Sequence, residues 1–596
     1  MAQAKKAAAG PLGAGRPSKA VFGSDLMVEV LRELGIKYMA LNPGASYRGL
    51  HDSIVNFDGG GPEMLMCAHE EFAVAIANGY ARVTGEPMAT GLHNVVGLAH
   101  ASMAIFNAWC DRTPMINLGG GGPQDSNHRR STDWVHTALV QGSLVREFTK
   151  LDDQPHSIEA VPESFLRAYR TATTKPKGPV YITLDTDVQE DTVPEGLVVP
   201  DVSQFAAPAA PAANPESLRR AAELLVGAEW PIIMPGETGL NREALAPLQE
   251  LAELLGAGVI DAGGPFNFPT THPLDVTGHR AAVLADTDVL LALDVPSLGV
   301  PLGPDVRERG ALQPAIGPDA KTIHITLLDL EKQSWVTDNM WLMPVAVPIA
   351  ADTAEALPEL VALCKAAIEA DPAASARIEA RRGKVQAIHD AHRAERDAWI
   401  ANTWDETPVS QARLYGEIAK VVEGRDWALV SAHGRRGREA IDTTEYGHGI
   451  GGGRGGGVGY GLPSSIGAAL GWKGRGRLVV SILGDGDFFM TSNALWTAAK
   501  YDIPLLIVLY NNRSYYNDEE HQERMAHRRD RPVENKGIGI QITEPAPDFA
   551  SLARSLSVAG FGPITDPNKI NETLVEAIKV VDSGKPAVVD IIMQPR

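Results

Sequence analysis

Asp485 and Asn512 are the residues whose types and spacing most directly predict a chemical site. Asp485 stands in a Gly-Asp-Gly turn after an apolar run typical of a buried strand, and Asn512 follows a second such run. A helix between the runs would make the two strands parallel neighbours, with both residues at one edge of the sheet. A carboxylate, an amide oxygen and the backbone carbonyl of Ser514 are oxygen ligands that Mg²⁺ or Ca²⁺ prefers. The spacing therefore predicts a divalent cation site.

A Gly-Asp-Gly triplet alone is also ordinary turn chemistry. Together with Asn511–Asn512, however, Gly484–Asp485–Gly486 resembles the cofactor motif of the thiamine diphosphate enzymes, in which GDG is followed by NN. The resemblance implies that Asp485, Asn512 and the Ser514 carbonyl bind Mg²⁺, and that the metal binds the diphosphate of thiamine diphosphate. Further cofactor contacts are then expected at Gly484, Gly486 and Asp487.

A second acidic site is predicted where an apolar strand, residues 64–68, runs into the helix-forming segment 72–83. An acid at this junction could simply stabilise the helix N-terminus through its dipole. The segment HEEFAVAIANGYARVTG also resembles the HE–A–GYAR–TG segment of the thiamine diphosphate enzymes. The resemblance implies that Glu70 is the cofactor-activating acid, which hydrogen-bonds a ring nitrogen of the aminopyrimidine, with Glu71 as the second choice.

An Asn-Pro-Gly turn follows a predicted strand at residues 38–41, and ligand sites of parallel sheets lie at such strand ends. Ser46 is a candidate pocket residue beside this turn. Ala45 stands where the benzoylformate decarboxylase branch of the family has a substrate-binding serine, so this position departs from that branch. The turn residues are candidate cofactor contacts: Asn42, Pro43 and Gly44.

His93 precedes a predicted helix of small residues. A histidine beside a helix start can be purely structural, but the benzoylformate decarboxylase branch has a substrate-facing histidine at this position, which implies a catalytic role for His93. The chain shows no clear counterpart of that branch's second histidine, and residues 145–150 are closer to the acetolactate synthase pattern. Further candidates for the substrate pocket are Trp134, His136 and Tyr515.

The glycine-rich run at residues 449–461 contains G-x-G-x-x-G, but no predicted strand precedes it, which argues against a dinucleotide site. The following residues, 458–467, resemble the GFGLP segment of the thiamine diphosphate enzymes. Val458 takes the place of a residue that is often larger in relatives and bends the cofactor. Val458 and Tyr460 are therefore candidate cofactor-binding residues.

Composition narrows the classes of partner. The 596 residues carry a net charge of −20 and are 44% hydrophobic, which predicts packed cores and argues against nucleic acid or an anionic membrane surface as partners. Three scattered cysteines predict neither a disulfide framework nor a zinc site and favour a cytoplasmic location. No apolar run reaches the ~20 residues of a membrane span.

The alternation of strand and helix patterns predicts an α/β protein with doubly wound parallel sheets. The resemblance implies three such domains. The first binds the pyrimidine of the cofactor, the second is the central domain, and the third binds the diphosphate. Residues 235–239 follow a strand as a nucleotide loop would, but lack GxGxxG, so FAD binding stays open. The expected segments are a disordered leader (1–19), a pyrimidine-binding domain (20–190), a linker (191–214), a central Rossmann-like domain (215–364), a helical connector (365–407) and a diphosphate-binding domain (408–596).

The resemblance implies an enzyme that depends on thiamine diphosphate and Mg²⁺ and cleaves or forms a C–C bond next to a carbonyl. A decarboxylase or lyase acting on a 2-keto acid or a related carbonyl compound is the first hypothesis, and a carboligase of the acetolactate synthase type is the alternative. A non-catalytic cofactor-binding protein is a third, which the joint presence of Glu70, Asp485 and Asn512 disfavours. Relatives build the site from two subunits, which implies a homodimer or homotetramer.

Overall fold

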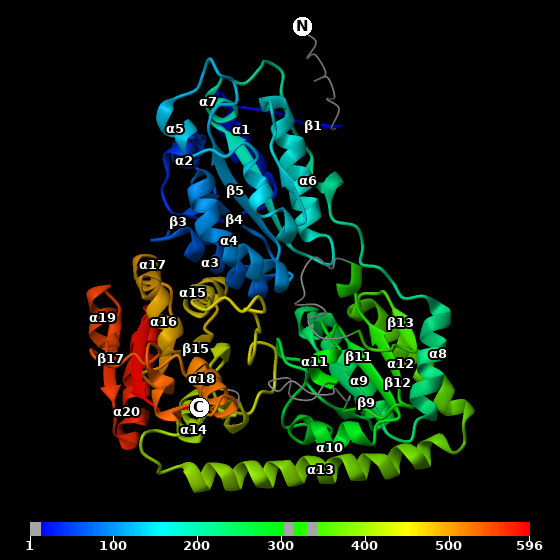
Figure 1. Cartoon of the computed structure of the whole chain (residues 1–596). Coiled ribbons are helices and arrows are strands. Elements are labelled where there is room, and N and C mark those ends of the chain that lie inside the picture. Colours follow the sequence, from blue (N-terminus) through cyan, green and yellow to red (C-terminus); the bar gives the residue numbers. More distant parts are fainter. Residues whose placement is uncertain (1–12, 303–314, 331–341, 435, 596) are drawn as a thin grey trace. The chain divides into compact units, whose positions relative to one another are not determined.

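The computed structural model describes residues 13–302, 315–330, 342–434 and 436–595 of the chain. Within these ranges, three parallel sheets are covered by helices, and one short antiparallel pair joins β1 (Gly15–Pro17) to β8 (Val198–Pro200) (Figure 1). The predicted α/β class with three doubly wound parallel sheets is therefore confirmed.

The first sheet has six parallel strands in the order β3-β2-β4-β5-β7-β6. Its two long strands are buried along their whole length, as expected for a parallel sheet with helices on both faces. The strands are β2 (Tyr38–Leu41), β3 (Glu63–Met66), β4 (Met88–Leu92), β5 (Met115–Gly121), β6 (Asp152–Asp153) and β7 (Pro179–Asp185). The helices are α1 (Gly23–Glu33), α2 (Arg48–Asn56), α3 (Glu70–Thr84), α4 (Asn94–Cys110), α5 (Ser131–Val135), α6 (Val161–Thr173) and α7 (Thr186–Glu190).

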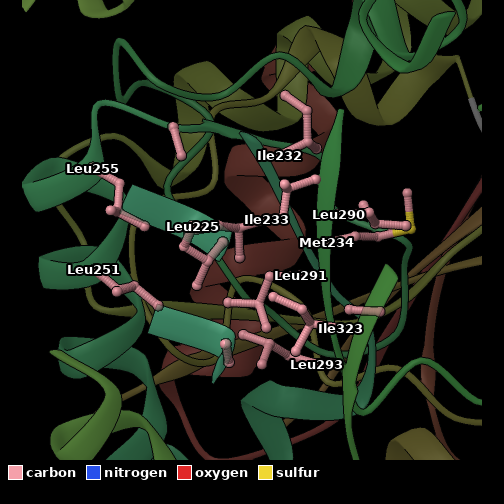
Figure 2. Packing of buried hydrophobic residues seen from close by; sticks show 14 of the residues in the cluster. Leu225, Ile232, Ile233, Met234, Leu251, Leu255, Leu290, Leu291, Leu293 and Ile323 are labelled. Atoms are coloured by element: carbon pink, nitrogen blue, oxygen red, sulfur yellow. The ribbon is translucent and has the colours of Figure 1, made fainter. Parts of the chain in front are cut away.

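The second sheet has five parallel strands in the order β10-β9-β11-β12-β13. Leucines of two flanking helices pack onto the apolar side chains of β9 and β11 to form its core (Figure 2). The strands are β9 (Pro231–Pro235), β10 (Gly258–Val259), β11 (Val289–Leu293), β12 (Lys321–Ile325) and β13 (Val347–Ile349). The helices are α8 (Pro215–Gly227), α9 (Leu245–Leu255), α10 (Arg280–Ala285), α11 (Gly299–Leu302) and α12 (Thr353–Ala370).

The third sheet has the order β14-β15-β16-β18-β17 and follows the long helix α13 (Ala374–Thr403). Gly484 of β15 pairs with Tyr510 of β16, so the two strands are parallel neighbours as predicted. The strands are β14 (Trp427–Ala432), β15 (Leu478–Gly484), β16 (Leu506–Asn511), β17 (Ala559–Ile564) and β18 (Ala587–Ile592). The helices are α14 (Gln411–Val422), α15 (Gly461–Trp472), α16 (Asp485–Thr491), α17 (Leu495–Lys500), α18 (Tyr516–Arg528), α19 (Phe549–Ser555) and α20 (Ile570–Asp582).

The structure corrects three local predictions. Residues 15–17 of the expected disordered leader form β1, and residues 198–200 of the expected linker form β8, because the two segments hydrogen-bond to each other; residues 1–12 of the leader lie outside the described part. In the Gly-Asp-Gly triplet, Gly484 ends β15 and Asp485 starts α16, so the triplet is not a free turn. Asp485 and Asp487 in the first turn of α16 favour a helix N-terminus through the dipole.

Chain contacts group the described residues into two compact units. The first contains residues up to 208 together with 453–473 and 490–503, and the second contains 209–452, 474–489 and 504 onward. The three domain ranges expected from the sequence stay a prediction. Of the helices in the described ranges, none is both long and apolar enough to span a membrane.

Two glycines let α3 and α15 pack closely within the first unit. A Cβ on Gly79 of α3 would stand 1.9 Å from the Ser464 carbonyl oxygen, and a Cβ on Gly467 of α15 would stand 1.9 Å from the Ile76 carbonyl oxygen. The obstacles are backbone atoms, which cannot rotate away as a side chain can. The close approach fixes the position of α3, whose first residue is Glu70.

We expect Gly467→Ala to lower the midpoint of thermal unfolding by several degrees, because overpacking at a rigid contact costs about 1–3 kcal/mol. Gly383→Ala in α13 is the matched control, since a Cβ there meets nothing within 4 Å. That substitution should leave stability unchanged or raise it slightly, as Ala is the better helix former. Equal midpoints for the two variants, measured by calorimetry, would contradict the packing constraint.

Candidate functional site

Asp485 lies directly after β15, and its side chain is 2% exposed. Burial raises the pKa of its carboxyl to about 6, and hydrogen bonds from the backbone amides of Gly486, Arg513 and Ser514 partly oppose that rise. Arg513 and Ser514 follow β16, so the ends of the two strands meet as predicted. Oδ2 of Asp485 is buried and has no hydrogen-bond partner among the described residues. An orphaned carboxylate oxygen of this kind fits a divalent cation.

The two neighbouring asparagines have different surroundings. Asn511 is buried and donates from Nδ2 to Oδ1 of Asp590 at 2.8 Å, so its side chain is part of the core. Asn512 is half-buried, and its Oδ1 accepts from the Ser514 amide at 3.1 Å. Asn512 is therefore the asparagine placed beside Ser514 and the Asp485 carboxylate.

The segment after Asn512 is held by contacts that the sequence did not reveal. Arg513 has a left-handed backbone with φ of 57°, which turns the chain sharply after β16. The Ser514 hydroxyl donates to Oε1 of the buried Glu519 at 2.9 Å. Tyr515 lies against the Gly-Asp-Gly segment, where a Cβ on Gly486 would stand 2.5 Å from its ring. Tyr515 therefore lines the diphosphate end of the predicted site.

His433 is a further neighbour of this segment that sequence reasoning missed. It follows β14, and its ring atom Cε1 would stand 3.0 Å from a Cβ on Gly484. Its position directly after β14 was the available signal, because that strand ends at the same sheet edge.

Glu70 is the first residue of α3 and is 5% exposed. Its Oε2 lies 3.0 Å from Nδ1 of His100, a residue of α4. A Cβ on Gly97 would stand 3.1 Å from Oε1 of Glu70, so this glycine makes room for the carboxyl. His69 stacks on His100 with ring centroids 4.7 Å apart, and burial lowers the pKa of His69, which favours its neutral form.

Glu71 has surroundings that differ from those of Glu70. It is half-buried, and its amide donates to Nδ1 of His69 at 3.2 Å in the helix cap. Burial raises the pKa of the Glu71 carboxyl. Only Glu70 has a carboxylate oxygen within hydrogen-bond distance of His100 among the described residues.

Three candidates for the substrate pocket come together in the first unit. Ser46 is fully buried, and its Oγ lies 3.0 Å from Nδ1 of His93. The rings of His93 and His136 meet edge to face, with centroids 5.3 Å apart. Trp134 instead packs against Arg129, whose guanidinium carbon lies 3.7 Å from the centre of the Trp134 ring. The structure therefore joins Ser46, His93 and His136 into one polar cluster.

The turn at residues 42–45 borders this cluster. Asn42 donates from Nδ2 to the Cys67 carbonyl at 3.0 Å, which ties the turn to the segment after β3. A Cβ on Gly44 would stand 2.5 Å from Cβ of His93, so the backbone there lies directly against the histidine. Pro43, Gly44 and Ala45 also line an open cavity of about 630 Å³.

Val458 and Tyr460 have different surroundings. The Val458 side chain is 51% exposed, whereas the Tyr460 hydroxyl donates to Oδ2 of Asp111 at 3.2 Å. The Asp111 carboxylate also accepts from the amides of Gly453 and Arg454, at 2.9 and 3.1 Å. Asp111 thus holds the glycine-rich loop, a role that no local sequence pattern indicated.

The chain is similar to known proteins over most of its length. Residues 22–144 match the family model for the thiamine pyrophosphate enzyme N-terminal TPP binding domain, and residues 434–591 match that for the C-terminal TPP binding domain. The chain is 26% identical to the probable acetolactate synthase large subunit of Methanocaldococcus jannaschii, over 96% of this chain and 92% of that protein. It is also 26% identical to the probable 2-ketoarginine decarboxylase of Pseudomonas aeruginosa, over 91% and 90%.

A solved structure shares the whole fold. The benzoylformate decarboxylase from Polynucleobacter necessarius superposes with a TM-score of 0.74 at 18% identity, covering 96% of this chain and 99% of that chain. Thiamine pyrophosphate is another name for thiamine diphosphate, so both matched models describe the cofactor expected from the GDG–NN and HE–GYAR–TG motifs. The chain belongs to the thiamine pyrophosphate-dependent enzymes, a family that includes decarboxylases and carboligases.

Proposed function

We propose that this enzyme uses thiamine diphosphate and Mg²⁺ to cleave a C–C bond next to a carbonyl, as a decarboxylase or lyase acting on a small 2-keto acid. The cluster of Ser46, His93 and His136 carries this proposal. A buried hydroxyl next to two imidazoles suits the binding of a 2-keto acid and the movement of a proton. The probable 2-ketoarginine decarboxylase among the relatives supports the same reaction class.

The diphosphate end of the cofactor is assigned to the second unit. Asp485 through Oδ2, Asn512 through its side-chain oxygen and Ser514 through its carbonyl would hold Mg²⁺, because all three offer hard oxygen donors. Gly484, Gly486 and Asp487 would contact the diphosphate at the start of α16. When bound, thiamine diphosphate supplies a carbon nucleophile and a ring that accepts the electron pair of the broken bond.

Glu70 is assigned to the aminopyrimidine end of the cofactor. Its carboxyl is buried, and its Oε2 is placed by Nδ1 of His100. In this position Glu70 can hold a proton and share it with a ring nitrogen, which is the acid–base step that activates the cofactor. Val458, with its exposed side chain, and the 42–44 turn are proposed as further cofactor contacts.

His93 is assigned to the substrate. The Ser46 hydroxyl is hydrogen-bonded to Nδ1 of His93, and the neighbouring His136 ring restricts the orientation of the His93 imidazole. We assign Nε2 of His93 to proton exchange with the substrate or product. Ala45 and Tyr515 are proposed as further residues of the substrate pocket.

An acetolactate synthase-like carboligase is the second candidate. The relative from Methanocaldococcus jannaschii, a probable acetolactate synthase large subunit, matches over 96% of this chain and favours it. In that case the pocket would accept a second carbonyl compound after CO₂ leaves. The polar histidine cluster, rather than the level of identity, is the reason we place the decarboxylase or lyase first.

Assembly and location extend the proposal. We propose a homodimer or homotetramer with active sites shared between subunits, because the segment 135–144 exposes four large apolar side chains, which single domains rarely leave in water. These are Val135, Leu139, Val140 and Leu144.

A cytoplasmic location is consistent with Cys67, Cys110 and Cys364, which are buried and form no disulfide among the described residues. FAD binding by the second sheet remains a question for direct assay.

The reaction class is tested by loading the purified enzyme with thiamine diphosphate and Mg²⁺ and supplying a panel of 2-keto acids, alone and with acceptor aldehydes. We expect CO₂ and an aldehyde from at least one 2-keto acid, because the histidine cluster can protonate the product. Accumulation of an acyloin or acetohydroxy acid from pyruvate would instead identify the carboligase.

Glu70→Gln should abolish turnover while leaving the fold and the binding of thiamine diphosphate intact, because the amide cannot exchange a proton with the cofactor. Glu71→Gln is the matched control, since it changes the next residue of the same helix and should keep most of the activity. The measurements are steady-state kinetics, circular dichroism and calorimetric cofactor binding. Near-normal turnover by Glu70→Gln would refute the assignment.

Binding of Mg²⁺ in the presence of thiamine diphosphate should weaken as the pH falls below about 6, the pKa to which burial raises Asp485. A raised pKa means that the carboxyl keeps its proton at low pH, so the metal must displace it, and affinity should drop about tenfold per pH unit below that value. Titration calorimetry between pH 5 and 8 measures this dependence.

Asp590→Asn is the control for the pH dependence, because burial raises the pKa of Asp590 to about 6 as well, while its Oδ1 is bound to Asn511. That variant should keep the dependence, whereas Asp485→Asn should lose most of the affinity at every pH. An affinity of the unmodified enzyme that stays constant from pH 5 to 8 would rule out Asp485 as the ligand.

A further inference from the structure

Helix α13 carries two metal-ligating side chains on one face. His392 and Glu395 are three residues apart, a spacing that places them on adjacent turns of the same side of a helix. His279 approaches them from the short 3-10 helix Thr277–His279 that precedes α10. All of these residues belong to the second unit, and none is used by the cofactor or substrate assignments.

The three side chains converge on one point. One ligand atom from each of His279, His392 and Glu395 lies within 4.8 Å of the other two. Nε2 of His279 is 3.5 Å from Oε2 of Glu395, and the two imidazole rings meet edge to face with centroids 5.4 Å apart. Ligands at about 2.0–2.2 Å from one tetrahedral metal ion stand roughly 3.3–3.6 Å from one another. Nε2 of His279 and Oε2 of Glu395 already have this separation, and side-chain movement would bring the third ligand atom, now within 4.8 Å, to the same distance.

The surroundings hold the histidines in place. The backbone at Gly278 lies directly against His392, because a Cβ there would stand 2.1 Å from Cε1 of the ring. One turn earlier on α13, His389 binds the Asp275 carbonyl through Nδ1 at 2.8 Å, which docks the helix beside the 277–279 segment. The Arg396 guanidinium donates to the carboxylates of Asp397 and Asp442, so its hydrogen bonds are directed away from the Glu395 carboxylate.

The donor atoms suit metal binding. Nε2 of His279 is buried and makes no hydrogen bond to any described residue. Two imidazoles and one carboxylate form a donor set that suits zinc and related transition metals, whereas Mg²⁺ prefers oxygen ligands.

We propose that His279, His392 and Glu395 bind a divalent transition-metal ion of the zinc class. Three protein ligands leave at least one position for water. The ion would link α13 to the 277–279 segment and stabilise the folded chain by mass action. This site differs in donor chemistry from the Asp485 site and does not depend on the proposed function.

The test uses the full-length enzyme loaded with thiamine diphosphate and excess Mg²⁺, which occupies the oxygen-donor site. Zn²⁺ binding is measured by titration calorimetry and thermal unfolding, and Co²⁺ binding by its visible absorption. We expect one equivalent of Zn²⁺ to bind and to raise the unfolding midpoint. Glu395→Gln, at a side chain 68% exposed, should keep the fold but weaken Zn²⁺ binding by at least about tenfold, and His392→Gln should do the same.

Two variants control for binding elsewhere. His272→Gln removes a histidine that pairs with Glu253 at 3.1 Å but has no third ligand among the described residues, and it should bind Zn²⁺ as the unmodified enzyme does. His100→Gln disrupts the His69–Glu70–His100 group, the other described cluster able to hold a metal. Loss of the equivalent in His100→Gln rather than in Glu395→Gln, or no Zn²⁺ binding by the unmodified enzyme, would overturn the proposal.

Discussion

Burial of the Asp485 carboxylate is the constraint on which the diphosphate half of the site depends. A charged group that loses water must find other partners, and here backbone amides from the ends of two parallel strands supply part of the compensation. One carboxylate oxygen has no hydrogen-bond partner in the part of the chain that the structure describes. The strand order, the left-handed turn at Arg513 and the hydroxyl bond from Ser514 to Glu519 all keep these groups at one sheet edge.

The other half of the site depends on close backbone packing. Glu70 begins α3, and paired glycines bring that helix against α15 at a distance that no side chain would allow. Glycine acts a second time at residue 97, where it leaves space for the Glu70 carboxyl. Glycine in a helix interior usually weakens the helix, so the glycines here reflect a packing requirement rather than helix propensity.

Much of the architecture could be predicted from the sequence because long apolar or periodic segments encode it locally. The strand predicted at residues 38–41 agrees with β2 to the residue, and the predicted helix-forming segment 72–83 lies within α3. β1 was missed because its three residues are ordered only by pairing with β8, far away in the chain. The roles of Asp111 and His100 were missed for the same reason, since each depends on a partner from another element. Ser46, His93 and His136 were separate candidates, and their convergence is a property of the fold.

The two asparagines after β16 have the same side chain but opposite tolerance to change. A single-base mutation converts asparagine to aspartate. At Asn511 it would place a second carboxylate 2.8 Å from Asp590 inside the core, where like charges repel strongly. At Asn512 the same mutation would keep an oxygen donor beside the proposed metal site and add a charge that favours a cation. Genetic variation at this pair should therefore be strongly asymmetric, although the residues are identical and adjacent.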